Sequence, residues 1–386
     1  MSQIRLALFT GNYNHIKDGV SLTLNRWVQF LEEHGVEVLV FAPSIDEPVL
    51  KHAGNLVVSP SIPMPVQGRG EYRFTTGLPP RIQNILEEYN PNLLHLATPD
   101  RLGFKALKWA LTNRVQTVAS YHTHFFSYLK YYGLDFIGFF GMRYLAWFYG
   151  KCCHTYVPSQ SMIEELQRFG IQADFRIWTR GVNNTLFSPE KRSEEWRSSI
   201  GFKEDDIVVT FVSRLVWEKE LETYIESVKR VAAINPRVKA LVVGEGPAME
   251  ELKQRLPDAH YAGFLVGEEL ARAYASSDVF LFPSHTETFG NVTLEAMASG
   301  LPCLVADAIG SKSLVQDGVN GKLGTIQDID HFTKQLEFLV HDDERRTEMS
   351  RKSREIALTY NWETINEGLL TNYKEAIASP LPQPRF

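Results

Sequence analysis

Cysteine is scarce in this chain, and its scarcity excludes a disulfide-stabilised fold. The three cysteines among the 386 residues are Cys152, Cys153 and Cys303. Adjacent cysteines pair poorly with each other, and an odd number leaves one thiol over, so no disulfide framework is expected. No cysteine or histidine spacing resembles a zinc site. These absences indicate a protein of a reducing compartment such as the cytoplasm.

Positive charge is not in excess either, and apolar runs are short. The formal net charge is -6, whereas nucleic-acid-binding proteins usually carry a basic excess, so no nucleic-acid partner is expected. The stretch nearest to a membrane span, residues 125–149, is aromatic-rich but contains Lys130, Asp135 and Arg143. The apolar run at the N-terminus is too short for a signal peptide. We expect a cytoplasmic protein, attached at most peripherally to the cytoplasmic face of the inner membrane.

The first half of the chain alternates short apolar runs with amphipathic helical patterns. This alternation predicts a parallel sheet covered by helices. The strands expected here are residues 4–10, 36–42, 93–96, 116–121 and 154–157. Residues 59–80 are rich in proline and glycine and are expected to form a long loop.

The same pattern restarts in the second half, and the length of the chain suits two domains. The strands expected here are residues 207–212, 239–243, 259–262, 279–282 and 302–306, with a linker or surface helix at 188–199 and a last helix at 362–378. The fold class is therefore α/β, with two Rossmann-like domains facing each other across a cleft. We place the domains at residues 1–187 and 188–365, with residues 366–386 packing back on the first. Ligands of such sheets bind beyond the carboxyl ends of the strands.

Two glutamates follow the strand expected at residues 279–282. Glu287 lies in the loop, Gly290 permits a tight turn, and a helix is expected to begin near Val292. The exposed amides and the dipole of a helix start favour a diphosphate. Glu295, one turn into this helix, can accept hydrogen bonds from two vicinal ribose hydroxyls. The alternative is that both glutamates are solvated surface residues.

Two cations, Arg214 and Lys219, follow the strand expected at residues 207–212. A departing nucleotide diphosphate develops negative charge, which an arginine and a lysine at fixed positions would stabilise in the transition state. Taken alone, the pair is equally well explained as two surface residues. Together with the glutamates, the pair indicates a site for a nucleotide diphosphate.

Two segments of the first half also follow expected strands. The loop at residues 10–20 carries Asp18 and Gly19, and glycine permits close approach of the backbone to a ligand. The loop is neither GxGxxG nor GxxxxGK[ST], so neither a nicotinamide enzyme nor a P-loop enzyme is indicated. His122 ends the strand at residues 116–121. It can bind a donor sugar or phosphate oxygen, or it can satisfy a carbonyl in the core.

With these residues assembled, the chain resembles family 4 of the retaining glycosyltransferases, which have the GT-B fold. The most specific piece is the Glu-x7-Glu spacing of Glu287 and Glu295, followed by Ala-Met-Ala-Ser-Gly-Leu-Pro at residues 296–302. Further signatures are Ser213-Arg214-Leu215 with Lys219, residues 243–247 and residues 180–183. Ser213 departs from the glycine that is commoner there. Residues 98–104 and 120–124 look nearest to bacterial α-mannosyltransferases and to diacylglycerol glycosyltransferases of the sulfoquinovosyl, glucuronosyl or glucosyl type.

The resemblance implies a role for each residue in a metal-independent reaction with a UDP- or GDP-sugar donor and no cofactor. Arg214 and Lys219 would neutralise the leaving diphosphate. Glu287 and His122 would contact the sugar, and Glu295 would hold the ribose. The other donor-binding residues implied are Asp18 and Gly19 at the diphosphate, Gly263, Phe264 and Leu265 at the base, and Phe289, Gly290, Asn291 and Val292 near the sugar. Retention would proceed by front-face attack, with no obligate protein nucleophile and no metal ligand.

The expected activity is transfer of a hexose or hexuronic acid to an acceptor, in the first place a membrane lipid such as diacylglycerol. A GDP-mannose-dependent α-mannosyltransferase acting on a glycan precursor is the alternative, and a nucleotide-sugar epimerase or a silent binding module are alternatives of other classes. Arg101, Lys105 and Lys108 fall on one face of the helix expected at residues 101–112. With the aromatic residues 125–149 they predict docking on an anionic membrane surface. The opposing interpretation is that the aromatic residues are core.

Overall fold

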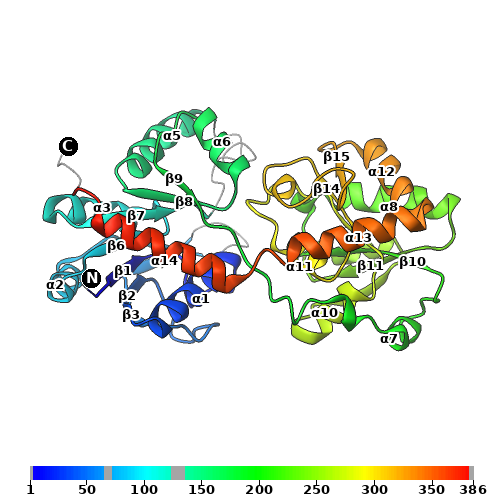
Figure 1. The fold of residues 1–386 in the computed structure, drawn as a ribbon, viewed down its shortest axis with the longest axis horizontal. Helices are drawn as coiled ribbons and strands as arrows, with labels where there is room; N and C mark the ends of the chain where they lie inside the picture. Colours follow the sequence, from blue (N-terminus) through cyan, green and yellow to red (C-terminus); the bar gives the residue numbers. More distant parts are fainter. Residues whose placement is uncertain (1–2, 65–71, 123–134, 382–386) are drawn as a thin grey trace. The chain divides into compact units, whose positions relative to one another are not determined.

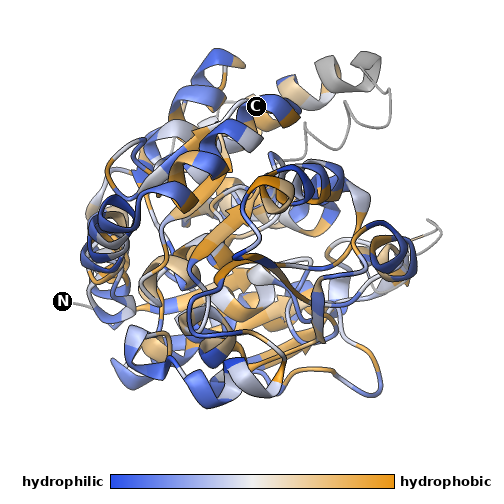
Figure 2. Cartoon of the chain, turned by 90° about the vertical axis from the view of Figure 1, so that its right-hand side faces the viewer, coloured by the Kyte–Doolittle hydropathy of each residue, from blue (hydrophilic) through white to orange (hydrophobic). Residues whose placement is uncertain are grey.

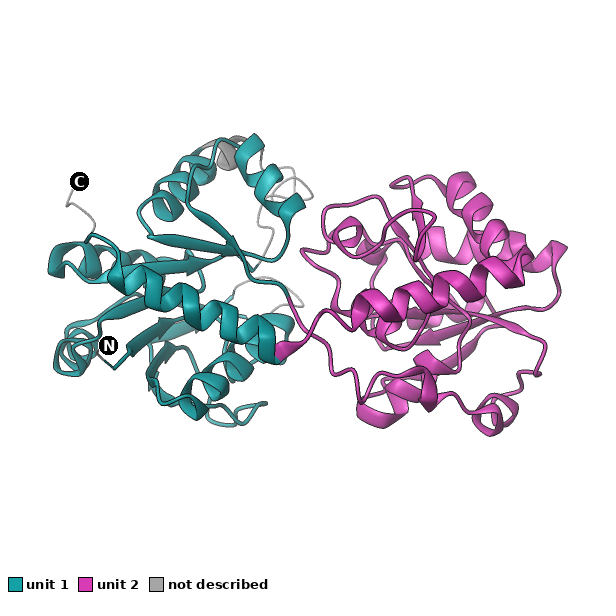
Figure 3. Ribbon diagram, in the orientation of Figure 1, with its two compact units in different colours: residues 1–179, 363–386 teal, residues 180–362 magenta. Residues whose placement is uncertain are grey.

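The structure is a computed structural model, and it describes residues 3–64, 72–122 and 135–381. The chain divides into two compact units (Figure 3). Unit 1 comprises residues 1–179 and 363–386, and unit 2 comprises residues 180–362. Each unit is built on its own parallel sheet with helices packed against it (Figure 1).

Unit 1 holds a seven-stranded parallel sheet in the order β3-β2-β1-β6-β7-β8-β9. Its strands are β1 (Arg5–Phe9), β2 (Glu37–Ala42), β3 (Asn55–Val58), β6 (Leu93–Leu96), β7 (Gln116–Ser120), β8 (His154–Val157) and β9 (Phe175–Ile177). Its helices are α1 (Gly19–Glu33), α2 (Pro80–Tyr89), α3 (Arg101–Asn113), α5 (Asp135–Gly150), α6 (Gln160–Arg168) and α14 (Trp362–Ala378). The chain order reverses between β1 and β6, so the loops after these two strands meet: the Gly11 amide donates to Thr98 Oγ1 at 2.9 Å.

The C-terminal helix α14 completes the core of unit 1. Tyr373 of this helix is fully buried, and its hydroxyl accepts a hydrogen bond from Trp27 Nε1 of α1 at 2.9 Å. The Trp27 and Tyr373 rings meet edge to face, 5.3 Å apart. Because aromatic side chains bury the largest apolar areas, this contact fixes the last helix to the first across the whole length of the chain.

Two sequence expectations for unit 1 differ from the structure. Residues 59–80 are not a continuous loop, because β4 (Ser61–Pro63) and β5 (Arg73–Thr75) pair as a short antiparallel sheet. The aromatic residues of α5 do not all face outward: Phe148 and Tyr149 are fully buried, whereas Phe140 is 62% exposed. The other aromatic residues of the predicted membrane segment, at positions 123–134, lie outside the described residues. In the part of the chain that the structure describes, no helix is both long enough and apolar enough to cross a bilayer.

Unit 2 holds a six-stranded parallel sheet in the order β12-β11-β10-β13-β14-β15. Its strands are β10 (Ile207–Val212), β11 (Val238–Val243), β12 (His260–Gly263), β13 (Val279–Phe282), β14 (Cys303–Ala306) and β15 (Gly321–Gly324). Its helices are α7 (Glu194–Ser199), α8 (Leu221–Ile234), α9 (Met249–Arg255), α10 (Gly267–Ala275), α11 (Asn291–Ala298), α12 (Ile329–His341) and α13 (Asp343–Ala357), with short 3-10 turns at Pro189–Lys191, Trp217–Lys219 and Ser311–Ser313. The strands are hydrophobic and the helices around them carry the polar residues (Figure 2).

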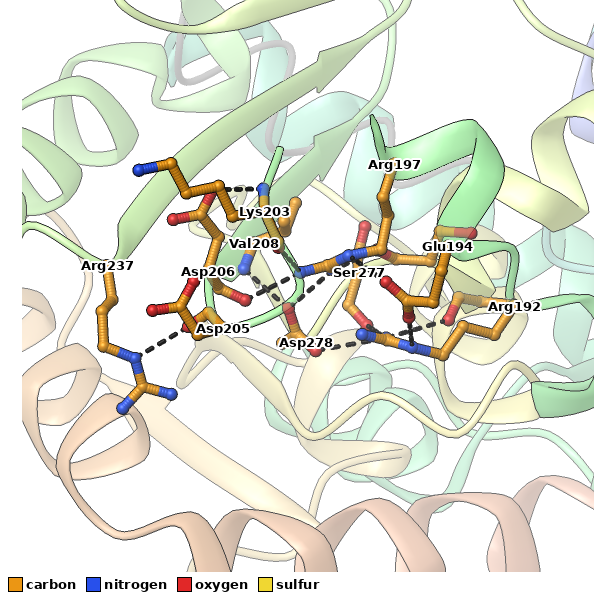
Figure 4. Close-up of polar contacts among 12 residues, drawn as sticks. Arg192, Glu194, Arg197, Lys203, Asp205, Asp206, Val208, Arg237, Ser277 and Asp278 are labelled. Carbon is orange, nitrogen blue, oxygen red and sulfur yellow. Dashed lines mark hydrogen bonds and ion pairs between the residues drawn. The ribbon is translucent and has the colours of Figure 1, made fainter. Parts of the chain in front are cut away.

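A buried ion pair anchors α7 at the amino ends of β10 and β13 (Figure 4). Arg197 of α7 is fully buried, and its Nη1 lies 3.1 Å from Asp278 Oδ2. The same carboxylate oxygen accepts from the Val208 amide at 2.8 Å, and the Arg197 guanidinium also donates to three backbone carbonyls. Residues 188–199, expected as a linker or surface helix, therefore form part of the core at Arg197, because a buried charge is stable only when paired and hydrogen-bonded.

Candidate active site

The carboxyl edge of the unit 2 sheet collects the residues expected to bind the donor. β10 is paired with β11 on one side and with β13 on the other, and all three strands are parallel. The chain order reverses between β10 and β13, which is where ligands of open α/β sheets bind. Arg214 follows β10, and Glu287 follows β13. Arg214 is exposed, and its guanidinium makes no hydrogen bond or ion pair with another residue that the structure describes.

Lys219 and Glu287 form an ion pair at this edge. Lys219 Nζ lies 2.5 Å from Glu287 Oε1 and 3.4 Å from Thr286 Oγ1. Ser284 Oγ donates to the same glutamate oxygen at 3.4 Å. Both side chains are about one-fifth exposed, 19% for Lys219 and 23% for Glu287. A cation and a carboxylate therefore lie side by side, and both are accessible to solvent. The sequence did not predict this contact or the hydrogen bonds of Ser284 and Thr286.

Glu220, next to Lys219, has an unusual backbone conformation, and its side chain is held by two neighbours. It adopts the left-handed conformation with φ of 58°, which few non-glycine residues do. Its carboxylate lies 3.3 Å from His285 Nδ1 and accepts from Gln327 Nε2 at 3.2 Å. The hydrogen bond from His285 lowers the pKa of Glu220. No role could be assigned to His285 from the sequence, and nothing there pointed to Glu220, since a glutamate is not a residue type expected at a positive φ.

The loop from Glu287 into α11 presents an uncapped helix start. Gly290 precedes the helix with φ of 98°, and none of the side chains that the structure describes caps the first amides of α11. A Cβ on Gly310, in the loop after β14, would lie 2.4 Å from the Glu287 carbonyl oxygen. The two loops are thus in close contact, and glycine at position 310 is required by that approach. Free helix amides favour an anion.

The neighbours of Gly290 differ in exposure. Phe289 is 4% exposed and belongs to the core of unit 2. Asn291 is exposed, and Val292 is partly buried against the same core. Of these residues, Asn291 has its side chain available to solvent, whereas Phe289 supports the loop from below.

Glu295 lies in the second turn of α11 in a desolvated environment. Its Oε2 accepts a hydrogen bond from the hydroxyl of Tyr274, which is fully buried in α10, at 3.3 Å. Burial raises the pKa of Glu295 to about 7, and the Tyr274 hydrogen bond opposes that rise. Glu295 therefore lies on the helix whose start is uncapped. It is desolvated and hydrogen-bonded to Tyr274, whereas Glu287 is partly exposed and paired with Lys219.

The segment expected at the nucleotide base follows β12. Gly263 ends the strand with φ of 69°, and its carbonyl accepts from the Gly244 amide at 2.7 Å. Phe264 is 63% exposed, while Leu265 packs against the core of unit 2. An exposed aromatic ring at the carboxyl edge of a sheet can stack on a base.

In unit 1 the expected residues also follow strands. Asp18 caps α1: its Oδ1 accepts from the Ser21 amide at 2.8 Å, and its Oδ2 accepts from Asn12 Nδ2 at 2.7 Å. Gly19 is the first residue of α1. His122 follows β7, is 8% exposed, and lies 2.7 Å from Ser120 Oγ through Nε2. The contact at its Nε2 is therefore to a side-chain hydroxyl.

Among the residues that the structure describes, no three His, Cys, Asp or Glu side chains group together as metal ligands would. Two aspartates spaced as a metal-binding Asp-x-Asp pair occur at positions 328 and 330, and both have other partners in the structure. Asp328 caps α12 by accepting from the His331 amide at 2.9 Å, and Asp330 pairs with Arg230 at 2.6 Å. These two carboxylates serve helix capping and a surface ion pair.

Two family models together match most of the chain. The model described as Glycosyl transferases group 1 matches residues 192–356, within unit 2, and the model described as Glycosyltransferase Family 4 matches residues 17–186. The fold and these matches define a glycosyltransferase of the GT-B type, with two Rossmann-like halves.

Curated relatives agree over nearly the full length. A GDP-mannose-dependent alpha-mannosyltransferase of Corynebacterium glutamicum is 32% identical over 382 residues, covering 97% of this chain and 90% of the relative. Sulfoquinovosyl transferase SQD2 of Arabidopsis thaliana is 31% identical, covering 89% and 68%. The structure of sucrose-phosphate synthase from Thermosynechococcus elongatus superposes with a TM-score of 0.77 at 20% identity, over 98% of this chain and all of the other. The chain belongs to glycosyltransferase family 4, and it transfers a sugar from a nucleotide sugar.

Proposed function

We propose that this chain is a retaining, metal-independent glycosyltransferase that moves a hexose or hexuronic acid from a UDP- or GDP-sugar to a lipid such as diacylglycerol. The observation that carries the donor side is the charged edge of unit 2. There a cation pair, Arg214 and Lys219, follows β10, and Glu287 follows the adjacent parallel strand. Family membership supports the class, and the roles of single residues are part of the proposal.

We assign each residue a role that its surroundings support. Arg214 and Lys219 neutralise the diphosphate as it leaves. When the donor binds, the Glu287 carboxylate accepts a hydrogen bond from a sugar hydroxyl, which replaces part of its contact with Lys219. The free amides at the start of α11, behind Gly290, receive the diphosphate, and ionised Glu295 accepts hydrogen bonds from the ribose.

Other donor contacts are assigned by segment. Gly263, Phe264 and Leu265 meet the base, Asn291 and Val292 approach the sugar with Phe289 behind them, and Asp18, Gly19 and His122 contribute from unit 1. In the reaction, the acceptor hydroxyl attacks the anomeric carbon on the face from which the diphosphate departs. The bond to the diphosphate breaks, and a phosphate oxygen of the leaving group takes the acceptor proton. This route needs no metal ion and no covalent intermediate on the protein.

The lipid acceptor is supported by the surface of unit 1. Arg101, Lys105 and Lys108 are all exposed on α3. Phe104 of the same helix packs against α5, with its ring 5.6 Å from that of Trp147. α5 also carries the exposed ring of Phe140. A basic helix face beside an exposed aromatic side chain suits the headgroup region of an anionic membrane.

Two relatives support a lipid acceptor. The alpha-monoglucosyldiacylglycerol synthases of Streptococcus pneumoniae and Acholeplasma laidlawii are each 25% identical to this chain, over 83% and 82% of its length. The similarity to the mannosyltransferase of Corynebacterium glutamicum favours, as second candidate, a GDP-mannose-dependent enzyme that acts on a glycan precursor.

The first experiment identifies the donor. Purified chain is screened by thermal shift against UDP- and GDP-sugars, because a ligand that binds the folded state raises its apparent stability. The stabilising donor is then incubated with diacylglycerol vesicles or with mannosyl oligosaccharides, with and without EDTA, and the anomeric configuration of the product is determined by NMR. A lipid product of retained configuration in the presence of EDTA is expected. A product formed on the oligosaccharide selects the second candidate, and an isomeric nucleotide sugar from donor alone would identify an epimerase.

The second experiment tests the membrane contact. The chain is sedimented with anionic or neutral vesicles at low and high salt. Binding is expected with anionic vesicles at low salt only, since each basic residue contributes about 1 kcal/mol and salt screens it. Replacing Arg101, Lys105 and Lys108 by glutamate should abolish it. If neither protein sediments at low salt, a soluble acceptor is the better proposal.

A further inference from the structure

A chain of buried hydrogen bonds leads from α1 to His122 in unit 1. Trp27 Nε1 donates to the Tyr373 hydroxyl at 2.9 Å, and this hydroxyl lies 2.5 Å from His95 Nδ1. His95 Nε2 lies 2.8 Å from Ser120 Oγ, which lies 2.7 Å from His122 Nε2. The first four residues are at most 1% exposed. Five side chains from α1, α14, β6, β7 and the segment after β7 are therefore connected without a gap.

The direction of these hydrogen bonds follows from their first member. The indole nitrogen of Trp27 is a donor and cannot accept. The Tyr373 hydroxyl must therefore accept from Trp27, and the structure gives it one other partner among the described residues, His95. Its own hydrogen must go to His95 Nδ1, because a fully buried hydroxyl hydrogen without an acceptor is unfavourable.

The remaining donors are then determined in turn. Desolvation lowers the pKa of His95 to about 3, so its ring is neutral and carries a single hydrogen. With Nδ1 accepting from Tyr373, that hydrogen is on Nε2 and is donated to Ser120. The Ser120 hydroxyl, which now accepts from His95, donates its hydrogen to His122 Nε2. The reverse direction would end at Tyr373 with a hydrogen that Trp27 cannot accept.

We propose that Tyr373 is a positioning residue which, through His95 and Ser120, holds His122 as the tautomer with its hydrogen on Nδ1. His122 then acts on the substrate as a hydrogen-bond donor and not as a base. This inference rests on the proposed contact between His122 and the donor sugar. It implies that the sugar presents an accepting oxygen to this histidine, either a hydroxyl or the carboxylate of a hexuronic acid. It also gives the C-terminal helix α14 a function in catalysis without any contact to the substrate.

The tautomer is measured directly by NMR. The full chain is labelled with 15N in histidine, and two-bond nitrogen–hydrogen correlations distinguish a protonated from an unprotonated ring nitrogen. The signals of His122 are assigned by their loss in His122→Asn. Wild type should show protonated Nδ1 and unprotonated Nε2 at His122. Ser120→Ala and Tyr373→Phe should give a mixture of the two tautomers, whereas Ser120→Thr, which keeps the hydroxyl, should retain the wild-type pattern.

Tyr156→Phe is the matched control. Tyr156 is fully buried and its ring lies 6.0 Å from that of His95, but its hydroxyl is not part of the chain of hydrogen bonds. This variant removes a buried tyrosine hydroxyl from the same region and should leave the tautomer of His122 unchanged. Protonated Nε2 at His122 in wild type, or an unchanged spectrum in Tyr373→Phe, would overturn the proposal.

Kinetics separate this inference from the proposed function. Tyr373→Phe should lower kcat/KM about tenfold in wild type and have little further effect in the His122→Asn background, because residues that act through one another are not additive. Equal effects in both backgrounds would show that Tyr373 acts only on stability. If the tautomers behave as expected but His122→Asn transfers sugar normally, the hydrogen-bond chain stands and the sugar contact of His122 is wrong.

Discussion

Ionised Glu295, the form proposed to bind the ribose, should lower the stability of unit 2. Burial raises its pKa from 4.5 to about 7, so the folded state binds the proton more tightly than the unfolded state does. Stability is therefore highest when Glu295 is protonated, and it falls as the pH rises through the window between 4.5 and 7. A shift of this size corresponds to about 3 kcal/mol at pH 8 and to less than about 1 kcal/mol at pH 5.

Glu295→Gln removes the ionisation and keeps the acceptor for Tyr274. The free energy of unfolding of the variant should exceed that of wild type by about 2 kcal/mol more at pH 8 than at pH 5. Because the chain has two units, the measurement is hydrogen exchange read on peptides of β10 and β13, which reports on unit 2 alone. Glu269→Gln, at an exposed position of α10, is the control and should change nothing beyond about 0.5 kcal/mol at either pH.

The same carboxylate gives a prediction for binding. The ionised form accepts hydrogen bonds from the ribose, so the affinity of wild type for a nucleotide sugar should fall about tenfold for each pH unit below 7. Calorimetry should show this fall in wild type and a weak, flat affinity in Glu295→Gln. A variant that is no more stable than wild type at pH 8, or that binds the nucleotide as wild type does, would refute the reasoning.

Three further predictions concern the charged residues of unit 2. Arg214→Ala and Lys219→Ala should each lower turnover about 100-fold with folding intact, and near-normal turnover in both would remove them from the reaction. Glu287→Ala should lower turnover more than it lowers the affinity for UDP or GDP, whereas Glu295→Ala should weaken that affinity. If calorimetry shows that Glu287→Ala weakens the affinity and Glu295→Ala does not, the two roles are reversed. Arg197→Ala should cost about 3–5 kcal/mol of unfolding free energy, because it removes the buried guanidinium that pairs with Asp278 and leaves three backbone carbonyls without their donor, and a smaller loss in urea unfolding would show that the anchor is dispensable.

Much of the fold could be predicted because strand and helix patterns are local. Each of the ten strands expected from apolar runs overlaps a strand in the structure, and the last helix covers the expected residues. The strands missed in the two parallel sheets lie at sheet edges: Asn55–Val58, Phe175–Ile177 and Gly321–Gly324. These strands are short and in part polar, because an edge strand is less buried than a central one. Their runs of apolar residues are therefore too short to predict a strand.

The sequence by itself determined which residue types follow the strands. Arg214, Lys219, Glu287 and Glu295 could be selected because a glycine turn, a strand and a helix start can be recognised from neighbouring residues. It also determined the family, through the same short motifs.

Only the tertiary structure decided which of these side chains meet. The ion pair of Lys219 with Glu287 spans 68 positions, and the hydrogen bond of His95 with Tyr373 spans 278. Such contacts depend on the order of strands in the sheet and on where α14 packs, and neither is encoded within a short stretch of sequence. The same holds for Arg197, whose polar surroundings in the sequence indicate a surface residue. Its burial follows from the position of Asp278 at the amino end of β13, a position that exists only once the sheet has formed.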